Sequence, residues 1–322
     1  MPEWLIERGI GETRSLLVDD GKIVEARIGL TGAIAAGTVL KARLTNVGTN
    51  RRNAVAVGEG GAEFLLPNGA PKVTEGAIIT IEVTREAIPG AEPWKRPIAR
   101  VSDREALAAP AFAEASEGKM LRLPAAQNRL ADLGWDDLIE EARTGIVIFA
   151  GGELRISPTP AMTLIDVDGY LPPQELAQLG AAEAARAIPR LDIGGSIGID
   201  LPTTRSKEAR QAAGAAIDDI LPQPFERTAV NGFGFVQIVR PRLRPSIVEL
   251  AQDRAAFEAR VLLRRAAFEA AGGRRLVAHP AVIRLLEGRS DWLAELARQM
   301  GGRVELRADA ALPMSGGYAE AL

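Results

Sequence analysis

The chain has 322 residues, 47% of them hydrophobic, with no cysteine and a single histidine, His279. This length suggests two or three compact units. The composition excludes disulfides, thiol nucleophiles, histidine-rich metal sites and zinc sites built on thiolates. The net charge is −3, from 39 basic and 42 acidic residues, so a nucleic-acid-binding role would need a local basic face.

The sequence favours a protein that does not enter a membrane. It has no run of about eighteen uncharged apolar residues, so we expect no membrane-spanning helix and no membrane partner. Residues 1–8 carry an acid early and lack the apolar segment of a signal peptide. We therefore expect a cytoplasmic location.

The first third of the chain has the pattern of short strands. Residues 1–34 alternate apolar and polar positions around the turn D-D-G-K, which predicts antiparallel strands. Residues 35–88 hold four or five short strand-like stretches between Gly and Asn turns, which fits a five-stranded OB-type barrel. Residues 89–104 carry three prolines and mixed charge, which indicates an irregular connector. A helical pattern runs through 105–145.

The rest of the chain alternates strand and helix. Over 146–240, strand-like runs such as T-L-I-D-V and G-S-I-G-I-D alternate with helical patterns near 174–188 and 206–220, which predicts an α/β layer with a mixed sheet. One long helix is predicted over 246–270, followed by a small α/β unit, and 314–322 are expected to fray. The predicted fold class is thus α/β, with several units.

Two aspartates end apolar runs in this region. Asp166 lies in T-L-I-D-V-D-G, and Asp200 lies in G-G-S-I-G-I-D-L. Asp200 follows Asp166 by 34 positions, which leaves room for one helix, so a crossover would make both strands parallel and bring their carboxyl ends to one edge. Two carboxylates there can share one hard cation such as Mg²⁺ or Mn²⁺. From spacing alone, the same aspartates could equally end strands and cap helices.

Arginines follow the second aspartate. Four of them, Arg227, Arg240, Arg242 and Arg244, lie between 227 and 248 without any acid. In R-P-R-L-R-P they alternate, so an extended segment would project three to one face, where guanidinium groups bind phosphate bidentately. A solvated edge strand with charged residues is the alternative. Arg205 and Lys207, which begin the helix after Asp200, are expected to extend the same surface.

The barrel offers a second basic surface. Its candidate RNA-binding residues are four cations, with Phe64 as a platform on which a base can stack. Phe64 in E-F-L-L is equally suited to the barrel core. The cations are Lys41, Arg43, Arg52 and Arg85.

Three stretches together resemble one known family. G-G-E-L-R-I-S-P-T-P-A-M-T-L-I-D-V-D resembles the segment of the ribonuclease E/G family that carries its first catalytic aspartate, with the pattern G-G-x-x-x-I, T-x-A, I-D-x-N. L-G-A-A-E-A-A-R-A-I-P-R-L-D-I-G-G-S-I-G-I-D resembles the family's helix and second aspartate strand. F-G-F-V-Q-I-V-R-P-R-L-R-P-S-I resembles its F-G-L-x-E-x-x-R-x-R-x-x-x-S-L block. The matches occur in the family's order over about 155–250.

The resemblance implies Mg²⁺-dependent hydrolysis of single-stranded RNA that leaves 5′-phosphate and 3′-hydroxyl ends, with Asp166 and Asp200 as catalytic metal ligands. Asp168 stands where the family has asparagine. This third acid could join the metal site, or it could raise the pKa of a neighbouring carboxyl by repulsion. The family's paired-cysteine zinc link cannot form here, so no zinc is expected.

An alternative function is a non-catalytic RNA-binding protein on the same framework, because the barrel has few aromatic residues and the family's long 5′-sensor insert is missing. The apolar stripe of the helix over 246–270 could also pair two copies into a homodimer.

The resemblance also implies a division into units. These are a ribonuclease-H-like scaffold (1–34 with 105–150), the barrel (35–88), a connector (89–104), a catalytic domain (151–248) and a C-terminal unit (249–322).

Overall fold

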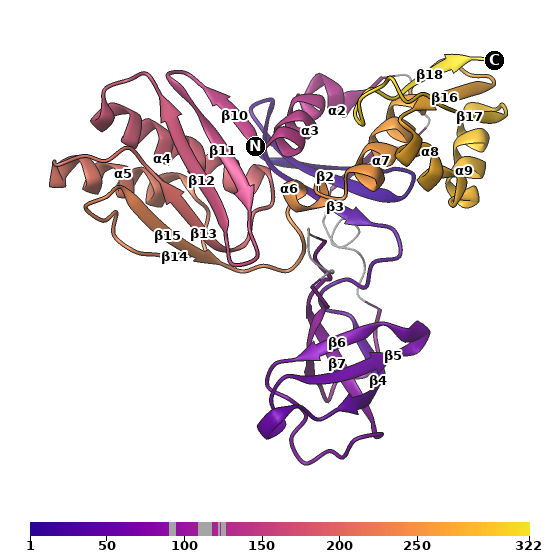
Figure 1. Ribbon diagram of the computed structural model, residues 1–322, viewed down its shortest axis with the longest axis horizontal. Coiled ribbons are helices and arrows are strands. Elements are labelled where there is room, and N and C mark those ends of the chain that lie inside the picture. The colour runs from indigo at the N-terminus through magenta and orange to yellow at the C-terminus, as the bar shows by residue number, and fades with distance from the viewer. Residues whose placement is uncertain (90–94, 109–117, 122, 124–126) are drawn as a thin grey trace.

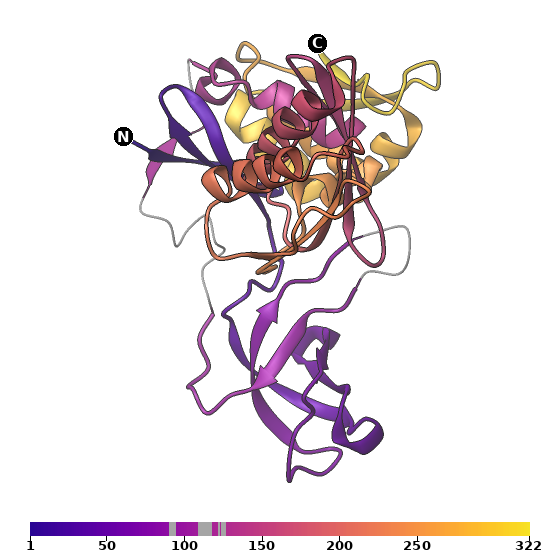
Figure 2. The ribbon, with the colours of Figure 1, turned by 90° about the vertical axis from the view of Figure 1, so that its left-hand side faces the viewer.

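Three open sheets and one closed five-stranded barrel organise the part of the chain that the computed structural model describes, which is residues 1–89, 95–108, 118–121, 123 and 127–322. In Figure 1 the barrel projects below a body that contains the three sheets. Figure 2, turned by 90°, shows the same separation. The predicted mixed α/β class and its barrel are thus confirmed.

The N-terminal sheet has the strand order β3-β2-β1-β9. As predicted for 1–34, β1, β2 and β3 are antiparallel neighbours, and Asp20 and Gly21 turn the chain with φ of 47° and 72°. The fourth strand falls within the stretch predicted to be helical, so that prediction is wrong for part of 105–145. The strands are β1 (Glu3–Arg8), β2 (Glu12–Asp19), β3 (Lys22–Leu30) and β9 (Lys119–Leu121).

The helices of that stretch begin later, at α2 (Arg129–Asp132) and α3 (Trp135–Thr144). Asn128 caps α2 with its side chain, and α3 buries Trp135 and Leu138 against the central sheet. The helical prediction for 109–117, 122 and 124–126 lies outside the described residues.

The barrel closes in the strand order β4-β5-β6-β8-β7. One of its strands, β8, pairs with β7 and β6 and lies inside the predicted connector 89–104, so that prediction is wrong for 98–101. Two 3₁₀ turns, η1 (Thr49–Arg51) and η2 (Glu59–Gly61), lie in its loops. The strands are β4 (Val39–Asn46), β5 (Ala54–Gly58), β6 (Glu63–Leu66), β7 (Ile78–Arg85) and β8 (Ile98–Val101).

The central sheet has six strands in the order β10-β11-β12-β13-β15-β14. It includes β10, so it starts before the predicted boundary at residue 151. Helices α4 (Pro173–Arg190) and α5 (Lys207–Ile220) pack together and bury Ala, Leu and Ile side chains against one face of the sheet. The strands are β10 (Ile146–Phe149), β11 (Gly152–Pro158), β12 (Thr163–Gly169), β13 (Gly195–Asp200), β14 (Glu226–Arg227) and β15 (Phe235–Arg240).

The predicted long helix over 246–270 is two helices, α6 (Ile247–Leu250) and α7 (Arg254–Ala266). Ser246 and Glu249 form a capping box that starts α6, and Asp253 caps α7, so the chain stops and restarts between them. The apolar stripe of α7 is buried inside the chain, where Leu262 and Leu263 pack in the C-terminal core. The homodimer contact predicted for this stripe is therefore wrong.

The C-terminal unit has a three-stranded sheet in the order β17-β16-β18. Its last strand covers residues that were predicted to fray, and it pairs antiparallel with β16. None of the helices in the described part of the chain combines the length and apolar character needed to span a bilayer. The elements are β16 (Arg274–Ala278), α8 (Pro280–Glu287), α9 (Ser290–Met300), β17 (Val304–Ala308) and β18 (Tyr318–Ala321).

Candidate functional site

Asp166 and Asp200 lie side by side on the central sheet. Strands β12 and β13 run parallel, and their register pairs Asp166 directly with Asp200, which sets the two backbones about 4.8 Å apart. Both aspartates are exposed, whereas their strand neighbours Ile165 and Ile199 are buried in the core that α4 covers. The two predicted acids therefore meet on the open face of the sheet.

The acids are close enough to affect each other's ionisation. Partial burial raises the pKa of Asp166, and the charges of Asp168 and Asp200 raise it further, while Arg155 opposes them. An ionised Asp166 thus has more negative than positive charge around it. Carboxylate oxygens are the ligands that hard divalent cations take, so the donor set of Asp166 and Asp200 fits such an ion.

Asp168 does not complete a three-carboxylate site. Among the residues that the structure describes, no group of three or more acidic or histidine side chains is arranged to hold a metal ion. Asp168 instead lies near a cation, with its Oδ2 3.6 Å from Nε of Arg155. The geometry therefore favours Asp166 and Asp200 as a pair, without Asp168.

Arg155 is a site residue that the sequence interpretation missed. It is the register partner of Asp166 on β11, it is exposed, and Glu153 accepts a hydrogen bond of 2.8 Å from its Nε. The sequence could have shown this position. If β11 and β12 form a hairpin around the loop 159–162, counting outward from the loop pairs residue 155 with residue 166. Arg155 places one positive charge directly beside the acid pair.

A scan against models of known protein families and a search of curated proteins find no match for this chain. The resemblance to the ribonuclease E/G family thus stays a prediction from the sequence. The site has to be judged by its own geometry.

The predicted arginine row does not form. β15 ends at Arg240, so the extended alternation stops before the other two arginines. Arg242 forms an ion pair with Glu249, and Nη1 of Arg244 lies 3.1 Å from Oδ2 of Asp192. Arg244 is buried, which removes it from any RNA-binding surface.

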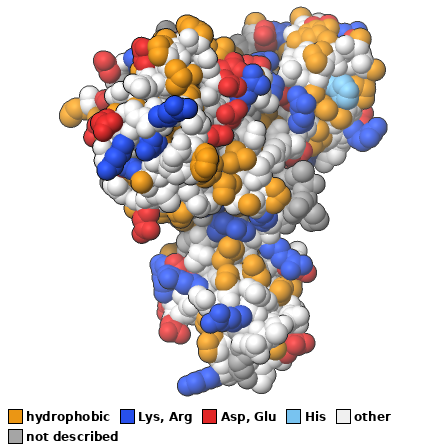
Figure 3. All heavy atoms as spheres, turned by 60° about the vertical axis from the view of Figure 1, so that its left-hand side comes forward, with side chains coloured by type: hydrophobic (Ala, Val, Ile, Leu, Met, Phe, Trp, Pro, Cys, Tyr) orange, Lys and Arg blue, Asp and Glu red, His pale blue; other side chains and the backbone are white. Residues whose placement is uncertain are grey.

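The segment that carries these arginines lies at the neck, where the barrel meets the body. The backbone N of Glu86, just after β7, donates to the carbonyl of Leu243 at 2.8 Å. Arg240 is half-buried and donates to the carbonyl of Ile193 at 3.4 Å. Figure 3 shows Lys and Arg side chains at this neck. Most of the predicted row is therefore buried or paired within the body, and the interpretation as an open phosphate-binding face is wrong.

The other predicted cations differ in their surroundings. Arg227 is committed to Asp218, whose Oδ1 accepts from its Nε at 2.7 Å, so its charge is neutralised locally. Arg205 and Lys207 are exposed in the segment that follows Asp200. These two keep the position that RNA binding near the acid pair requires.

The barrel residues also divide. Phe64 is 0% exposed and fills the barrel core, so its prediction as a stacking platform is wrong. Arg85 is half-buried at the neck and donates to the carbonyl of Arg96 at 2.7 Å. Three predicted cations are exposed and stay candidates for RNA contacts. They are Lys41, Arg43 and Arg52.

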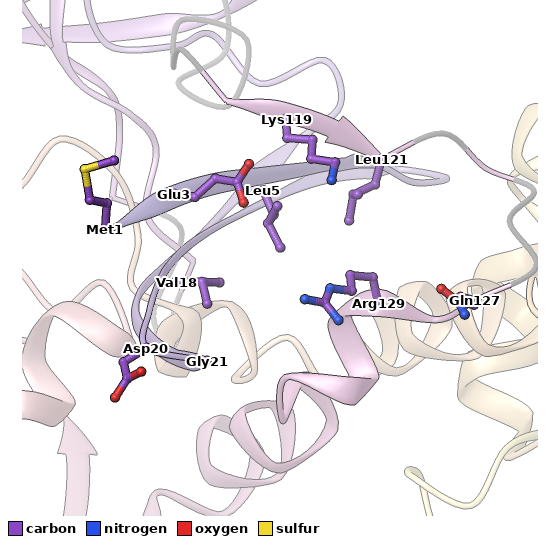
Figure 4. A pocket seen from close by; sticks show the side chains of 10 residues that line it. All are labelled: Met1, Glu3, Leu5, Val18, Asp20, Gly21, Lys119, Leu121, Gln127 and Arg129. Carbon is purple, nitrogen blue, oxygen red and sulfur yellow. The ribbon is translucent and has the colours of Figure 1, made fainter.

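A cavity of about 660 Å³ lies elsewhere, between the N-terminal sheet and the start of α2. Figure 4 shows Lys119 and Arg129 on one side of it, with Glu3 and Asp20 also on its wall. Its two cationic side chains are matched by two anionic ones. None of the predicted site residues lines this cavity.

Asp192, the acid that pairs with Arg244, has a pKa that differs from that of an exposed aspartate. Burial raises the pKa of Asp192 to about 6, and Arg244 only partly offsets this. In an unfolded chain the pKa is about 3.9, so between about pH 4 and 6 the folded state holds more protons and loses stability as the pH rises. The substitution Asp192→Asn removes the titrating carboxyl group, keeps the shape of the side chain and tolerates the positive φ of 54° at this position.

We therefore expect wild type to lose on the order of 1–2 kcal/mol of stability relative to Asp192→Asn between pH 4 and 7. Urea unfolding at several pH values measures this difference. Parallel stability curves for the two proteins would contradict the assignment.

Proposed function

We propose that this chain is a Mg²⁺-dependent endoribonuclease that hydrolyses single-stranded RNA and leaves 5′-phosphate and 3′-hydroxyl ends. The observation that carries the proposal is the register of β12 and β13, which makes Asp166 and Asp200 direct neighbours on an open sheet face. The resemblance of the same stretches to the ribonuclease E/G family supports it.

Asp166 and Asp200 would hold the ion through their carboxylate oxygens. When bound, Mg²⁺ neutralises phosphate charge and lowers the pKa of water enough to make it a nucleophile near neutral pH. Arg155, exposed beside Asp166 and paired with Glu153 through Nε and Nη2, places a guanidinium group within the site, where it can bind a phosphate oxygen. Arg205 and Lys207, in the segment after Asp200, attract the backbone on either side of the cut.

The test uses a labelled single-stranded RNA with the purified protein. We expect internal cleavage with Mg²⁺ or Mn²⁺ and loss of cleavage to background when the ion is removed with EDTA. The products should carry a 5′ phosphate, so a kinase should label them only after phosphatase treatment. Cleavage that persists in EDTA, or products with a 2′,3′-cyclic phosphate, would contradict the mechanism.

The same assay separates the alternative of a non-catalytic RNA-binding protein. That alternative expects a gel shift with the RNA and no metal-dependent product. The commitment of Arg242 and Arg244 to acidic partners weakens the case for it, because a pure binder would depend on such cations.

A further inference from the structure

An exposed aromatic ring lies next to the acid pair. Phe233 is 80% exposed, although a phenyl ring gains from burial. It lies in the turn 231–234 just before β15. The side-chain oxygen of Asn231 accepts hydrogen bonds from the backbone N of Phe233 at 2.9 Å and of Phe235 at 3.1 Å. The turn is thus held in one shape, and it presents the ring to solvent.

The turn is also fastened to the segment that follows Asp200. The Thr203 hydroxyl donates to the carbonyl of Phe233 at 2.9 Å, and the backbone N of Leu201 donates to the carbonyl of Gly234 at 3.2 Å. A Cβ at Gly234 would lie 2.1 Å from the carbonyl oxygen of Leu201, so only glycine allows this approach. Since Asp200 pairs with Phe235 and Leu201 bonds to Gly234, the turn that holds Phe233 lies directly beyond the end of β13 that carries Asp200.

The opposite side of the acid pair is apolar as well. Phe235 shares the open face with Asp200, because directly opposed residues of antiparallel strands point the same way. A Cβ at Gly198 would lie 2.6 Å from Cζ of Phe235, so the glycine leaves room for the ring to lie across β13. Leu164, the register partner of Gly198, extends this apolar surface beside Asp166.

We propose that Phe233 is a nucleobase-stacking subsite that binds an unstacked base next to the phosphate that an ion at Asp166 and Asp200 would bind. The inference rests on the proposed function and specifies its substrate as RNA with an unpaired base at the cut. A flat ring exposed beside a phosphate-directed acid pair suits a base, because every base has a π face and stacks without sequence preference. Arg205, two residues after Thr203, places a cation where the adjoining phosphate would lie.

The experiment measures binding and cleavage separately. A single-stranded RNA that carries the fluorescent base 2-aminopurine is titrated with wild type, Phe233→Ala and Phe233→Trp. We expect quenching with wild type, weakening of binding by about 5- to 150-fold with Phe233→Ala, and recovery with Phe233→Trp. Tyr318→Ala, which removes an exposed ring from the C-terminal unit, should bind as wild type does.

A second RNA tests the same point without a base. A strand with abasic sites should bind wild type and Phe233→Ala with equal affinity, because the ring then has nothing to stack on. Circular dichroism checks that each variant is folded, which the exposure of the ring leads us to expect.

The outcomes distinguish the inference from the function. Equal binding of the 2-aminopurine RNA by wild type and Phe233→Ala overturns the inference, even if both cleave RNA. Phe233-dependent quenching without metal-dependent cleavage supports the stacking site and refutes the nuclease. A wild type that binds no RNA, or a dimer in solution that Phe233→Ala dissociates, would assign the ring to another role and overturn the proposal.

Discussion

Asp166→Asn and Asp200→Asn are each expected to lower Mg²⁺-dependent cleavage of single-stranded RNA by more than about a hundredfold. Loss of an outer-shell partner of a metal ligand typically costs 10- to 100-fold, and loss of a ligand itself should cost more. Asn keeps the shape of the side chain and one oxygen but removes the charge that binds the ion. Initial rates over a range of Mg²⁺ concentrations measure the effect, because a weakened ligand set also needs more metal.

The matched control is Asp219→Asn. Asp219 is an exposed aspartate on α5, and this helix packs with α4 against the other face of the sheet. This variant should cleave like wild type. RNA binding, measured by gel shift without metal, should survive in all three variants, since the remaining cations still contact phosphates. If either site variant retained full cleavage at low Mg²⁺, the acid pair would not be the metal site.

The acid pair was predictable because strong local patterns determine it. Each aspartate follows an apolar stretch with buried isoleucines, Ile165 in one and Ile197 and Ile199 in the other, and the spacing between them permits little other than one crossover helix. The crossover makes the two strands parallel and places their carboxyl ends at one edge, as predicted. The exact register, which sets Asp166 opposite Asp200, is a finding of the structure.

The prediction of an open arginine row was wrong because the acid that pairs with Arg244 is distant in the sequence. Asp192, the partner of Arg244, precedes it by 52 residues, and no local pattern connects them. The alternation argument also needed an extended strand, which ends at Arg240 just before Pro241. Charge pairing between residues distant in sequence thus changed the role of residues whose local pattern was suggestive.

Phe64 shows a different limit. In β6, Phe64 and Leu66 share the inner face, while Leu65 lies on the outer one. Alternation tells which residues share a face, but with apolar residues on both faces it does not tell which face is inside. The restart of the helix at α7 was, by contrast, readable, because Asp253 is a residue type that favours the N-cap position.

A buried ionic cluster gives the second large expected effect, which is on the free energy of unfolding. Two carboxylates and three guanidinium groups are buried together where the N-terminal sheet meets α7. Nη1 of Arg14 lies 2.8 Å and Nε of Arg264 lies 2.9 Å from Oε1 of Glu7. Arg14 also reaches Glu12 at 2.6 Å, and Arg260 pairs with Glu12 at 2.8 Å. Burial acts to raise the pKa of Glu12, but Arg14 and Arg260 outweigh it and leave that pKa lowered.

Because the cluster holds one more cation than anions, its members are not equivalent. Glu7→Gln leaves three buried arginines with one carboxylate, and we expect it to destabilise the fold by about 3–5 kcal/mol, the cost of breaking a buried pair. Arg14→Met leaves Glu7 with Arg264 and Glu12 with Arg260, so it should cost clearly less. Urea unfolding followed by tryptophan fluorescence compares the two.

The control for this asymmetry is Arg298→Ala, which breaks an exposed pair with Glu295 on α9 and should cost no more than about 1 kcal/mol. If Arg14→Met destabilised as much as Glu7→Gln, the shape of the buried side chains rather than their charge balance would hold the sheet to α7. The expected order, with the loss of the acid costing most, follows from charge alone, because the acids bridge arginines that would otherwise repel one another in a low dielectric. The N-terminal sheet and α7 are thus joined by ionic contacts within the chain itself.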